Sequence, residues 1–290
     1  MKKTQIVLTT LVLLASISCS KDNMMLKDGI SQNDSSIPFI GITESYSPHT
    51  KTYRDTNGNV LWKRNDQVSI FAGSTINELY QVTDASEGKT SAALNKVGSS
   101  GFVAGSDLPA NIAYYPYSAS NEIAKSGSAY AITVDLPSTQ NYVEYSFGNG
   151  AFPMAAVTSN ESDYNLKFKN ALGGLKLQLK GTARISRITV MGNNGETLCG
   201  TATLNVSNAT TPSIALTDAT KTLVTLDCGE GVQLNTETAT TFVIALPPIT
   251  MTGGFTVDIY DTGSGTQQIK STRSQTITRS ALLAMPEISI

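Results

Sequence analysis

The sequence predicts an all-β protein, and three observations support this prediction. Short runs that alternate polar and apolar residues recur along the chain, as in Gln67–Ala72 and Leu175–Lys180. Turn signals such as Asn193-Asn194-Gly195 separate these runs at intervals of about 8–12 residues. Charged residues make up only 15% of the 290 residues, whereas Thr and Ser, which cover strand surfaces, are abundant. We therefore expect two tandem β-sandwich domains.

The first 18 residues have the pattern of an export signal. Lys2 and Lys3 precede an apolar run, Ile6–Ala15, that is too short to span a bilayer. We interpret residues 1–18 as a signal peptide that is cleaved before Cys19. A cysteine at this place is typical of a bacterial lipoprotein, in which it carries acyl chains such as palmitate; the alternative is an ordinary secretory signal. The polar residues 19–36 are expected to form a flexible tether.

The N-terminal sandwich is predicted over residues 37–163. It starts with an apolar run at Ile37–Ile42, and an Asn-Gly turn at Asn57-Gly58 provides a strong hairpin signal. The other strands of this half are expected at Thr52–Arg54, Val60–Trp62, Gln67–Ala72, Ile112–Tyr117 and Ala131–Leu136.

The C-terminal sandwich is predicted over residues 164–290. The unbroken alternation of Leu175–Lys180 predicts a half-buried strand with its leucines inward. The best helix signal, a single turn, lies at Lys167–Leu175, and Asn193-Asn194-Gly195 is expected to form a hairpin. Further strands are expected at Leu166–Lys169, Ile185–Met191, Thr197–Leu204, Thr222–Leu226, Thr241–Leu246, Phe255–Tyr260 and Gln267–Lys270.

Charge and composition argue against nucleic-acid binding and against most enzyme classes. The formal net charge is −2, and it becomes −4 once Lys2 and Lys3 leave with the signal peptide. A phosphate-binding surface needs clustered cations instead. His49 is the only histidine, and no His/Cys cluster has the spacing of metal ligands. We predict no catalysis, no cofactor and no metal, although carboxylates that meet only in space stay open.

Two cysteines remain after Cys19. Cys199 and Cys228 form an even pair, and such a pair in an oxidising compartment is able to form a disulfide. The alternative is two buried free thiols. The sequence leaves both alternatives open.

Four segments follow one another in a recognisable order between residues 60 and 260. They are Val60–Phe71, Ala113–Tyr117, Phe168–Leu177 and the pair Phe242–Pro248 with Gly253–Val257. Together with the lipoprotein signal, their order and spacing resemble the fimbrillin family of Bacteroidales surface lipoproteins, the pilins and pilin-like proteins.

The resemblance implies transthyretin-like topology in both sandwiches and assembly by strand exchange. In that family a trypsin-like protease cuts after a basic residue and releases the first strand. The open groove then accepts a strand from another subunit. Arg54 is the best candidate for the cut, with Lys51, Lys63 and Arg64 as competitors; the alternative for each is a plain surface cation. Ser274–Ile290 is the candidate donor, or else the last strand of the second sandwich.

We therefore expect a surface-exposed outer-membrane lipoprotein that serves cell adhesion as a structural or accessory (tip or anchor) subunit of fimbriae. Its expected partners are other fimbrillin subunits, the outer membrane through the lipid, and a host or bacterial surface ligand. The alternative is a monomeric surface lipoprotein that binds a glycan or a host protein. Exposed, coplanar Tyr or Trp rings would favour the alternative, and an apolar groove under Ile37–Ile42 would favour the fibre subunit.

Overall fold

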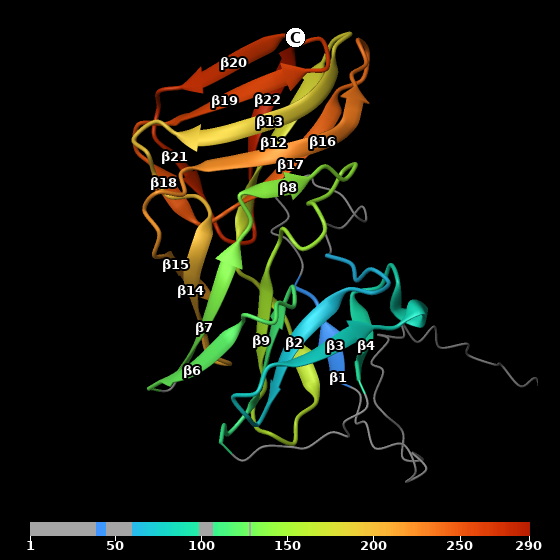
Figure 1. Ribbon diagram of the computed structural model, residues 1–290, viewed down its shortest axis with the longest axis vertical. Coiled ribbons are helices and arrows are strands. Elements are labelled where there is room, and N and C mark those ends of the chain that lie inside the picture. Colours follow the sequence, from blue (N-terminus) through green and yellow to red (C-terminus); the bar gives the residue numbers. More distant parts are fainter. Residues whose placement is uncertain (1–38, 45–59, 99–106, 128) are drawn as a thin grey trace, which may run out of the picture. The chain divides into compact units, whose positions relative to one another are not determined.

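The computed structural model describes residues 39–44, 60–98, 107–127 and 129–290 (Figure 1). All of them belong to one compact unit, Ser35–Ile290. Cys19, His49 and Arg54, the signal peptide and the tether lie outside the described residues. Within the described residues, strands make up nearly all regular structure, and the helical part is one short 3-10 turn, Asp84–Ser86. The predicted all-β fold class is confirmed.

An eight-stranded sheet contains most of the N-terminal strands. Its order is β10-β1-β4-β3-β2-β5-β9-β11. Only Phe168 separates β10 from β11, so the two ends of this order are consecutive in the chain and the sheet curls into a nearly closed ring. The strands are β1 (Phe39–Ile42), β2 (Gln67–Ala72), β3 (Glu78–Val82), β4 (Ser91–Lys96), β5 (Asn111–Tyr115), β9 (Met154–Val157), β10 (Asn165–Lys167) and β11 (Lys169–Asn170).

A core cluster of its own fills one face of this sheet. Period-two alternation explains which residues reach it, because Val68 and Ile70 of β2 join this cluster while Phe71 joins the larger core. The bulkiest fully buried members are Phe39, Trp62, Ile70, Tyr80, Leu94 and Phe168.

Two further sheets share the larger core, and their inward residues include Leu177 from one sheet and Ile188 from the other. The five-stranded sheet has the order β20-β19-β13-β16-β8, and the three-stranded sheet has the order β17-β12-β22. Their strands are β8 (Thr139–Asn141), β12 (Gly173–Lys180), β13 (Arg184–Gly192), β16 (Leu223–Gln233), β17 (Thr240–Leu246), β19 (Phe255–Asp261), β20 (Thr266–Ser271) and β22 (Leu282–Ser289).

The remaining strands form a four-stranded sheet, β15-β14-β7-β6, and a β18-β21 pair. Two strands from the N-terminal half pair with strands from the C-terminal half: β7 pairs with β14, and β8 pairs with β16. The predicted domain boundary near residue 163 stays a prediction. The strands are β6 (Glu122–Ser126), β7 (Ala129–Leu136), β14 (Gly200–Val206), β15 (Ser213–Leu216), β18 (Ile249–Met251) and β21 (Gln275–Ile277).

The predicted helical turn at Lys167–Leu175 is wrong. These residues belong to β10, β11 and β12. The glycines serve close packing in a strand and do not end a helix: a Cβ on Gly173 would lie 2.1 Å from the carbonyl oxygen of Thr278, and one on Gly174 would lie 2.7 Å from that of Ile244.

Two other local predictions are also wrong. Val60–Trp62 forms no strand, because the Trp62 backbone bonds instead to the turn at Gly88 and Lys89. Asn193-Asn194-Gly195 does form a turn, closed by Gly195 N–H donating to Gly192 O at 3.1 Å. It joins no hairpin, however, since β13 and β14 lie in different sheets. In the described part of the chain, no helix is long and apolar enough to cross a membrane.

Candidate functional site

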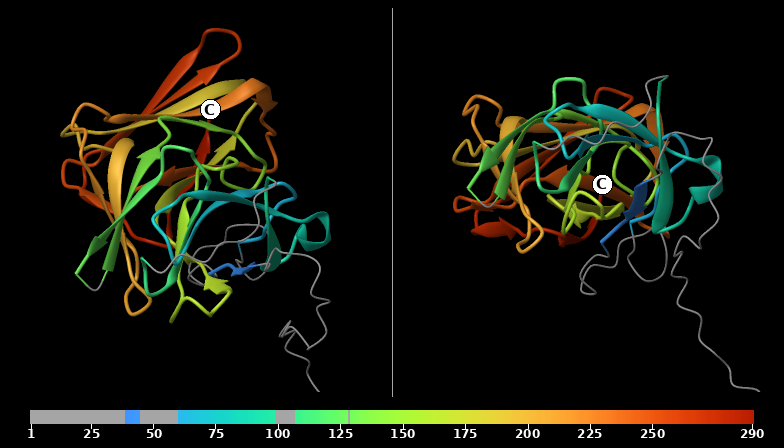
Figure 2. Two further views of the ribbon diagram at one scale, coloured as in Figure 1. Left: turned by 60° about the horizontal axis from the view of Figure 1, so that its bottom comes forward. Right: turned by 90° about the horizontal axis from the view of Figure 1, so that it is seen from below.

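The first strand lies in a groove that the rest of the sheet provides. β1 pairs antiparallel with β4 and parallel with β10. Figure 2 shows β1 in blue beside the teal β4. Phe39 is fully buried and meets the rings of Tyr80 and Tyr164 edge-on, each at 5.4 Å between centroids. Such contacts add to the roughly 1.5–3 kcal/mol that burial of a large apolar side chain contributes.

Gly41 marks the tightest point of the groove. A Cβ at this position would lie 3.0 Å from Trp62, 3.1 Å from Leu94 and 3.3 Å from Phe168. All three neighbours are side-chain atoms, so a methyl group needs shifts of only a few tenths of an ångström, whereas a larger side chain has no room. The β1 backbone therefore sits directly on the core.

Trp62 contacts β1 from the side of the core. Its indole Nε1–H donates to the Gly41 carbonyl at 3.1 Å, and its side chain is only 1% exposed. The ring also packs edge-on against Phe168 at 5.3 Å and Tyr115 at 5.8 Å. The only tryptophan of the chain thus contacts the first strand. The groove beneath β1 is lined by apolar and aromatic side chains.

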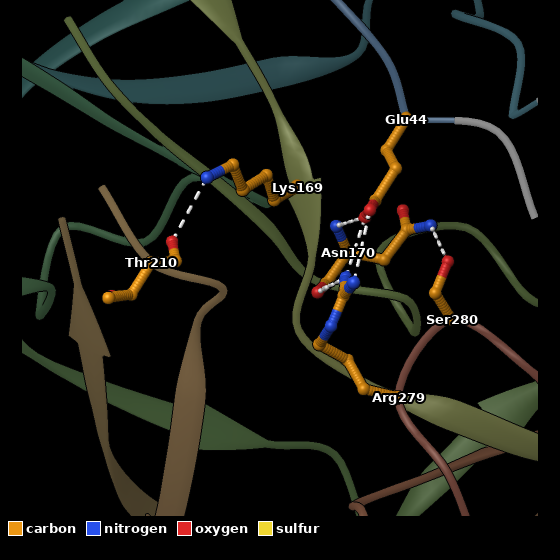
Figure 3. A network of polar contacts seen from close by, with 6 residues as sticks. All are labelled: Glu44, Lys169, Asn170, Thr210, Arg279 and Ser280. Atoms are coloured by element: carbon orange, nitrogen blue, oxygen red, sulfur yellow. Dashed lines mark hydrogen bonds and ion pairs between the residues drawn. The ribbon is translucent and has the colours of Figure 1, made fainter. Parts of the chain in front are cut away.

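A carboxylate just beyond β1 ties it to a distant part of the chain (Figure 3). Glu44 accepts two bonds from the Arg279 guanidinium, at 2.6 and 3.1 Å, and one from the Asn170 backbone N–H at 2.7 Å. Arg279 also donates to the Asn170 carbonyl at 2.9 Å, and the Asn170 amide donates to Ser280 Oγ at 2.8 Å. We call Arg279 together with the Asn170 backbone the carboxylate socket.

The carboxylate socket lies directly before the last strand. Arg279 and Ser280 connect β21 to β22, and Ser280 N–H donates to the Leu172 carbonyl at 2.8 Å. The side chains of Arg279 and Glu44 are 21% and 28% exposed, so the pair is partly shielded from water. Bidentate geometry and partial burial make it stronger than an ordinary surface ion pair.

Replacing Arg279 by methionine is expected to lower the free energy of unfolding by about 2 kcal/mol, because Glu44 keeps its burial but loses its cation. Urea denaturation followed by circular dichroism measures this change. Lys169→Met is the matched control, since Lys169 donates only to the exposed Thr210 carbonyl, and we expect an effect below about 0.5 kcal/mol. Equal effects of the two variants would contradict the importance of the pair.

The last strand lies at the edge of its sheet. β22 pairs with β12 alone, in parallel, with a register shift between Lys176 and Gln178. Its apolar residues Leu283, Met285 and Ile288 are only partly buried against the larger core. Within Ser274–Ile290, β21 pairs with β18 and β22 lies in the chain's own C-terminal sheet. The role of this segment as a donor stays a prediction.

Two of the predicted cleavage candidates lie among the described residues. Lys63 donates to Asn149 Oδ1 at 2.7 Å, and Arg64 pairs with Asp84 at 2.9 Å through side chains that are 58% and 69% exposed. Arg64 is therefore accessible at the surface. The role of Arg54, which is outside the described residues, stays a prediction.

Cys199 and Cys228 are both buried free thiols in the structure. Cys199 Sγ lies 3.3 Å from the Leu223 carbonyl oxygen, and Cys228 is five residues further along the same strand. At about 3.3 Å per residue, the two are roughly 16 Å apart, whereas a disulfide joins Cα atoms within about 7 Å. Burial raises the pKa of both thiols, to about 12 for Cys228.

We expect neither thiol to react with iodoacetamide at pH 8 in the folded chain, because both are buried and protonated. In a Cys19→Ser background, two thiols should react after unfolding in urea without reductant. Mass spectrometry counts the alkylated sites. Alkylation that requires prior reduction would instead demonstrate the other alternative, a disulfide between Cys199 and Cys228.

Sequence reasoning missed Gly41, Glu44, Asn170 and Arg279. One signal was available for the first, since an isolated glycine inside an apolar strand often marks a close backbone approach. Glu44 and Arg279 are 235 residues apart in the chain, and no local pattern connects them. Among the described residues, no group of three or more His, Cys, Asp or Glu is arranged to hold a metal.

Comparison with solved structures finds the same fold. A candidate cell adhesion protein from Bacteroides ovatus is 15% identical with a TM-score of 0.52, over 86% of this chain and 91% of that one. A second, from Bacteroides uniformis, is 16% identical with a TM-score of 0.49, over 88% and 95% of the two chains. No family model and no curated protein sequence matches this chain. The likeness establishes the fold and agrees with the all-β class predicted from the sequence.

Proposed function

We propose that this chain is a subunit of a cell-surface adhesive fibre that assembles by strand exchange. In this proposal β1 leaves its groove, and the groove accepts a strand from another copy. The observation that carries the proposal is the seating of β1: a four-residue strand lies between β4 and β10 and covers an aromatic core. The cell adhesion described for the protein of the same fold from Bacteroides ovatus agrees with this function.

The cost of an empty groove supplies the driving force for assembly. Without β1, the apolar atoms of Trp62, Tyr80, Leu94 and Phe168 would face water, and β4 and β10 would each lose a pairing partner. Exposed apolar surface costs about 25 cal/mol per Å², and unpaired edges favour the addition of another strand. An incoming strand that alternates in the same way removes both costs.

The last strand is suited to be the donor. β22 lies at a sheet edge, carries partly exposed apolar side chains and is paired on one side only. An edge strand loses fewer contacts on leaving than a central one. We further propose that the chain is exported and held at the outer membrane by acylation of Cys19. A Cys19→Ser variant should then incorporate no label when cells are grown with a palmitate analogue.

Mild trypsin digestion of the unlipidated chain from residue 19 tests the proposal. We expect a single cut between Lys51 and Arg64, followed by oligomers in size-exclusion chromatography, because the cut leaves β1 held only by non-covalent contacts. Mass spectrometry identifies the cut. Resistance in this region, or a cut that leaves a stable monomer, would contradict strand exchange and favour a cap, an anchor or a monomeric binding protein.

One observation favours the second function, a monomeric lipoprotein that binds a glycan. A cavity of about 340 Å³ is lined by Tyr142, Glu144, Tyr145 and Asn235 among other residues. Tyr145 is 39% exposed, and aromatic rings beside amide and carboxylate groups suit sugar rings. Trp62, in contrast, is buried and unable to contact a ligand. Loss of glycan-array binding in Tyr145→Ala would support this function.

A further inference from the structure

The first and last strands carry the same pattern of residue types. Residues 39–44 read Phe-Ile-Gly-Ile-Thr-Glu, and residues 282–287 read Leu-Leu-Ala-Met-Pro-Glu. In both segments two apolar residues precede a small one, an apolar residue follows it, and a glutamate stands three positions after the small residue. The two segments lie in different sheets.

We propose that residues 282–287 of a second copy of this chain replace residues 39–44, in the register that places Ala284 at the position of Gly41 and Glu287 at that of Glu44. The inference rests on the proposed function and adds the register and the acceptor residues that select the incoming strand. Two positions carry it: the tight point of the groove and the carboxylate socket.

The tight point selects the small residue. A Cβ at position 41 lies 3.0–3.3 Å from Trp62, Leu94 and Phe168, all through side-chain atoms. Alanine, whose side chain is a single methyl group, demands the smallest shifts of these neighbours. Within 282–287 only Ala284 meets this demand, so a shift of one residue would place Leu283 or Met285 against Trp62.

The carboxylate socket selects the glutamate. Once Glu44 leaves with β1, the Arg279 guanidinium and the Asn170 N–H lose their anion at a partly buried position. A carboxylate on the incoming strand restores both contacts. In its home sheet Glu287 pairs with Lys180 at 2.8 Å, through side chains that are 47% and 25% exposed. The exchange replaces this pair by one between Glu287 and Arg279, at a position that is more shielded from water.

The other positions are compatible with the same register. Ile40 donates its N–H to the Tyr164 carbonyl at 2.9 Å, and the Ile42 carbonyl accepts from Phe168 N–H at 2.7 Å. Leu283 and Met285 provide the equivalent groups. Pro286, at the place of Thr43, has neither an N–H nor a hydroxyl, so the backbone bond from Thr43 to the Thr90 carbonyl is lost, together with the bonds from the Thr43 hydroxyl to the Val60 and Thr90 carbonyls.

Cross-linking tests the register directly. Gly41 lies opposite Ala92 and Phe39 lies opposite Leu94 in the antiparallel pair of β1 and β4, and opposite residues lie close enough for a disulfide. A chain with Ala284→Cys is mixed with one that carries Ala92→Cys or Leu94→Cys, and both are digested with trypsin under mild oxidation. We expect a disulfide between positions 284 and 92. A bond between 284 and 94, or none in oligomers that do form, would overturn the register.

A second test changes the size of the side chain at position 284, which has different surroundings in its own sheet and in the groove of the acceptor. Position 284 is exposed in the home sheet, so Ala284→Leu should fold normally, as judged by circular dichroism. We expect it to reduce the yield of oligomers at least about tenfold, because the larger side chain meets Trp62 and Leu94 in the acceptor. Ser289→Leu, at another exposed position of β22 outside the exchanged segment, is the matched control and should assemble normally.

The two proposals fail in different ways. If the unaltered digested chain gives no oligomers, strand exchange itself is wrong. If it gives oligomers that Ala284→Leu and Ser289→Leu affect equally, strand exchange stands and the register is wrong.

Discussion

Replacing Trp62 by alanine is expected to lower the free energy of unfolding by about 3–5 kcal/mol, the range for loss of a large buried aromatic side chain. The indole is 1% exposed, packs against Tyr115 and Phe168, and donates to the Gly41 carbonyl. The variant leaves a cavity beneath β1 and removes the indole hydrogen bond to the Gly41 carbonyl. Urea denaturation followed by far-UV circular dichroism measures the loss.

Trp62→Phe separates packing from hydrogen bonding in that result. Phenylalanine keeps an aromatic ring in the core but cannot donate to Gly41, so we expect a smaller loss, on the order of 1–2 kcal/mol. If Trp62→Ala costs less than about 1 kcal/mol, the cluster around Trp62 is not the core that holds β1.

Gly41→Val is expected to loosen the seating of β1 in its groove without any proteolysis. Both methyl groups of valine extend beyond a Cβ position that already lies 3.0 Å from Trp62 and 3.1 Å from Leu94. Such overpacking costs about 1–3 kcal/mol, which raises the population of molecules in which β1 has moved away from the core. Because Trp62 is the only tryptophan, its fluorescence should shift to longer wavelength when water reaches the indole.

The graded control for this variant is Gly41→Ala. A single methyl group needs only small movements of three side chains, so its emission maximum should stay near that of the unaltered chain. An unshifted emission maximum in Gly41→Val would mean that the groove widens around the valine. In that case Gly41 would not be the tight point that selects the incoming residue.

Local patterns were sufficient where period-two alternation was strong. Gln67–Ala72 is β2 itself, and Leu175–Lys180 lies within β12 with its leucines buried. Prediction failed where pairing partners, and not residue types, make the strand. β4, for example, reads Ser-Ala-Ala-Leu-Asn-Lys, a composition with little β-propensity, yet the ladder to β1 and β3 holds it extended.

Contacts between distant segments also redirected elements that looked local. The turn at Asn193-Asn194-Gly195 was predicted as a hairpin because its residues suit one. In the structure, β14 pairs with β7 and β15 instead. A turn motif reports how the chain bends, but pairing with distant strands decides whether the two flanking strands pair with each other.

The sequence by itself determined the all-β class, most strand positions and the apolar character of the first and last strands, because side-chain alternation and turn residues act over a few neighbours. Only the tertiary structure decided that Gly41 lies on Trp62 and that Glu44 meets Asn170 and Arg279, which are 126 and 235 residues away in the chain. These contacts depend on sheet order and register, which are set by packing of the whole core.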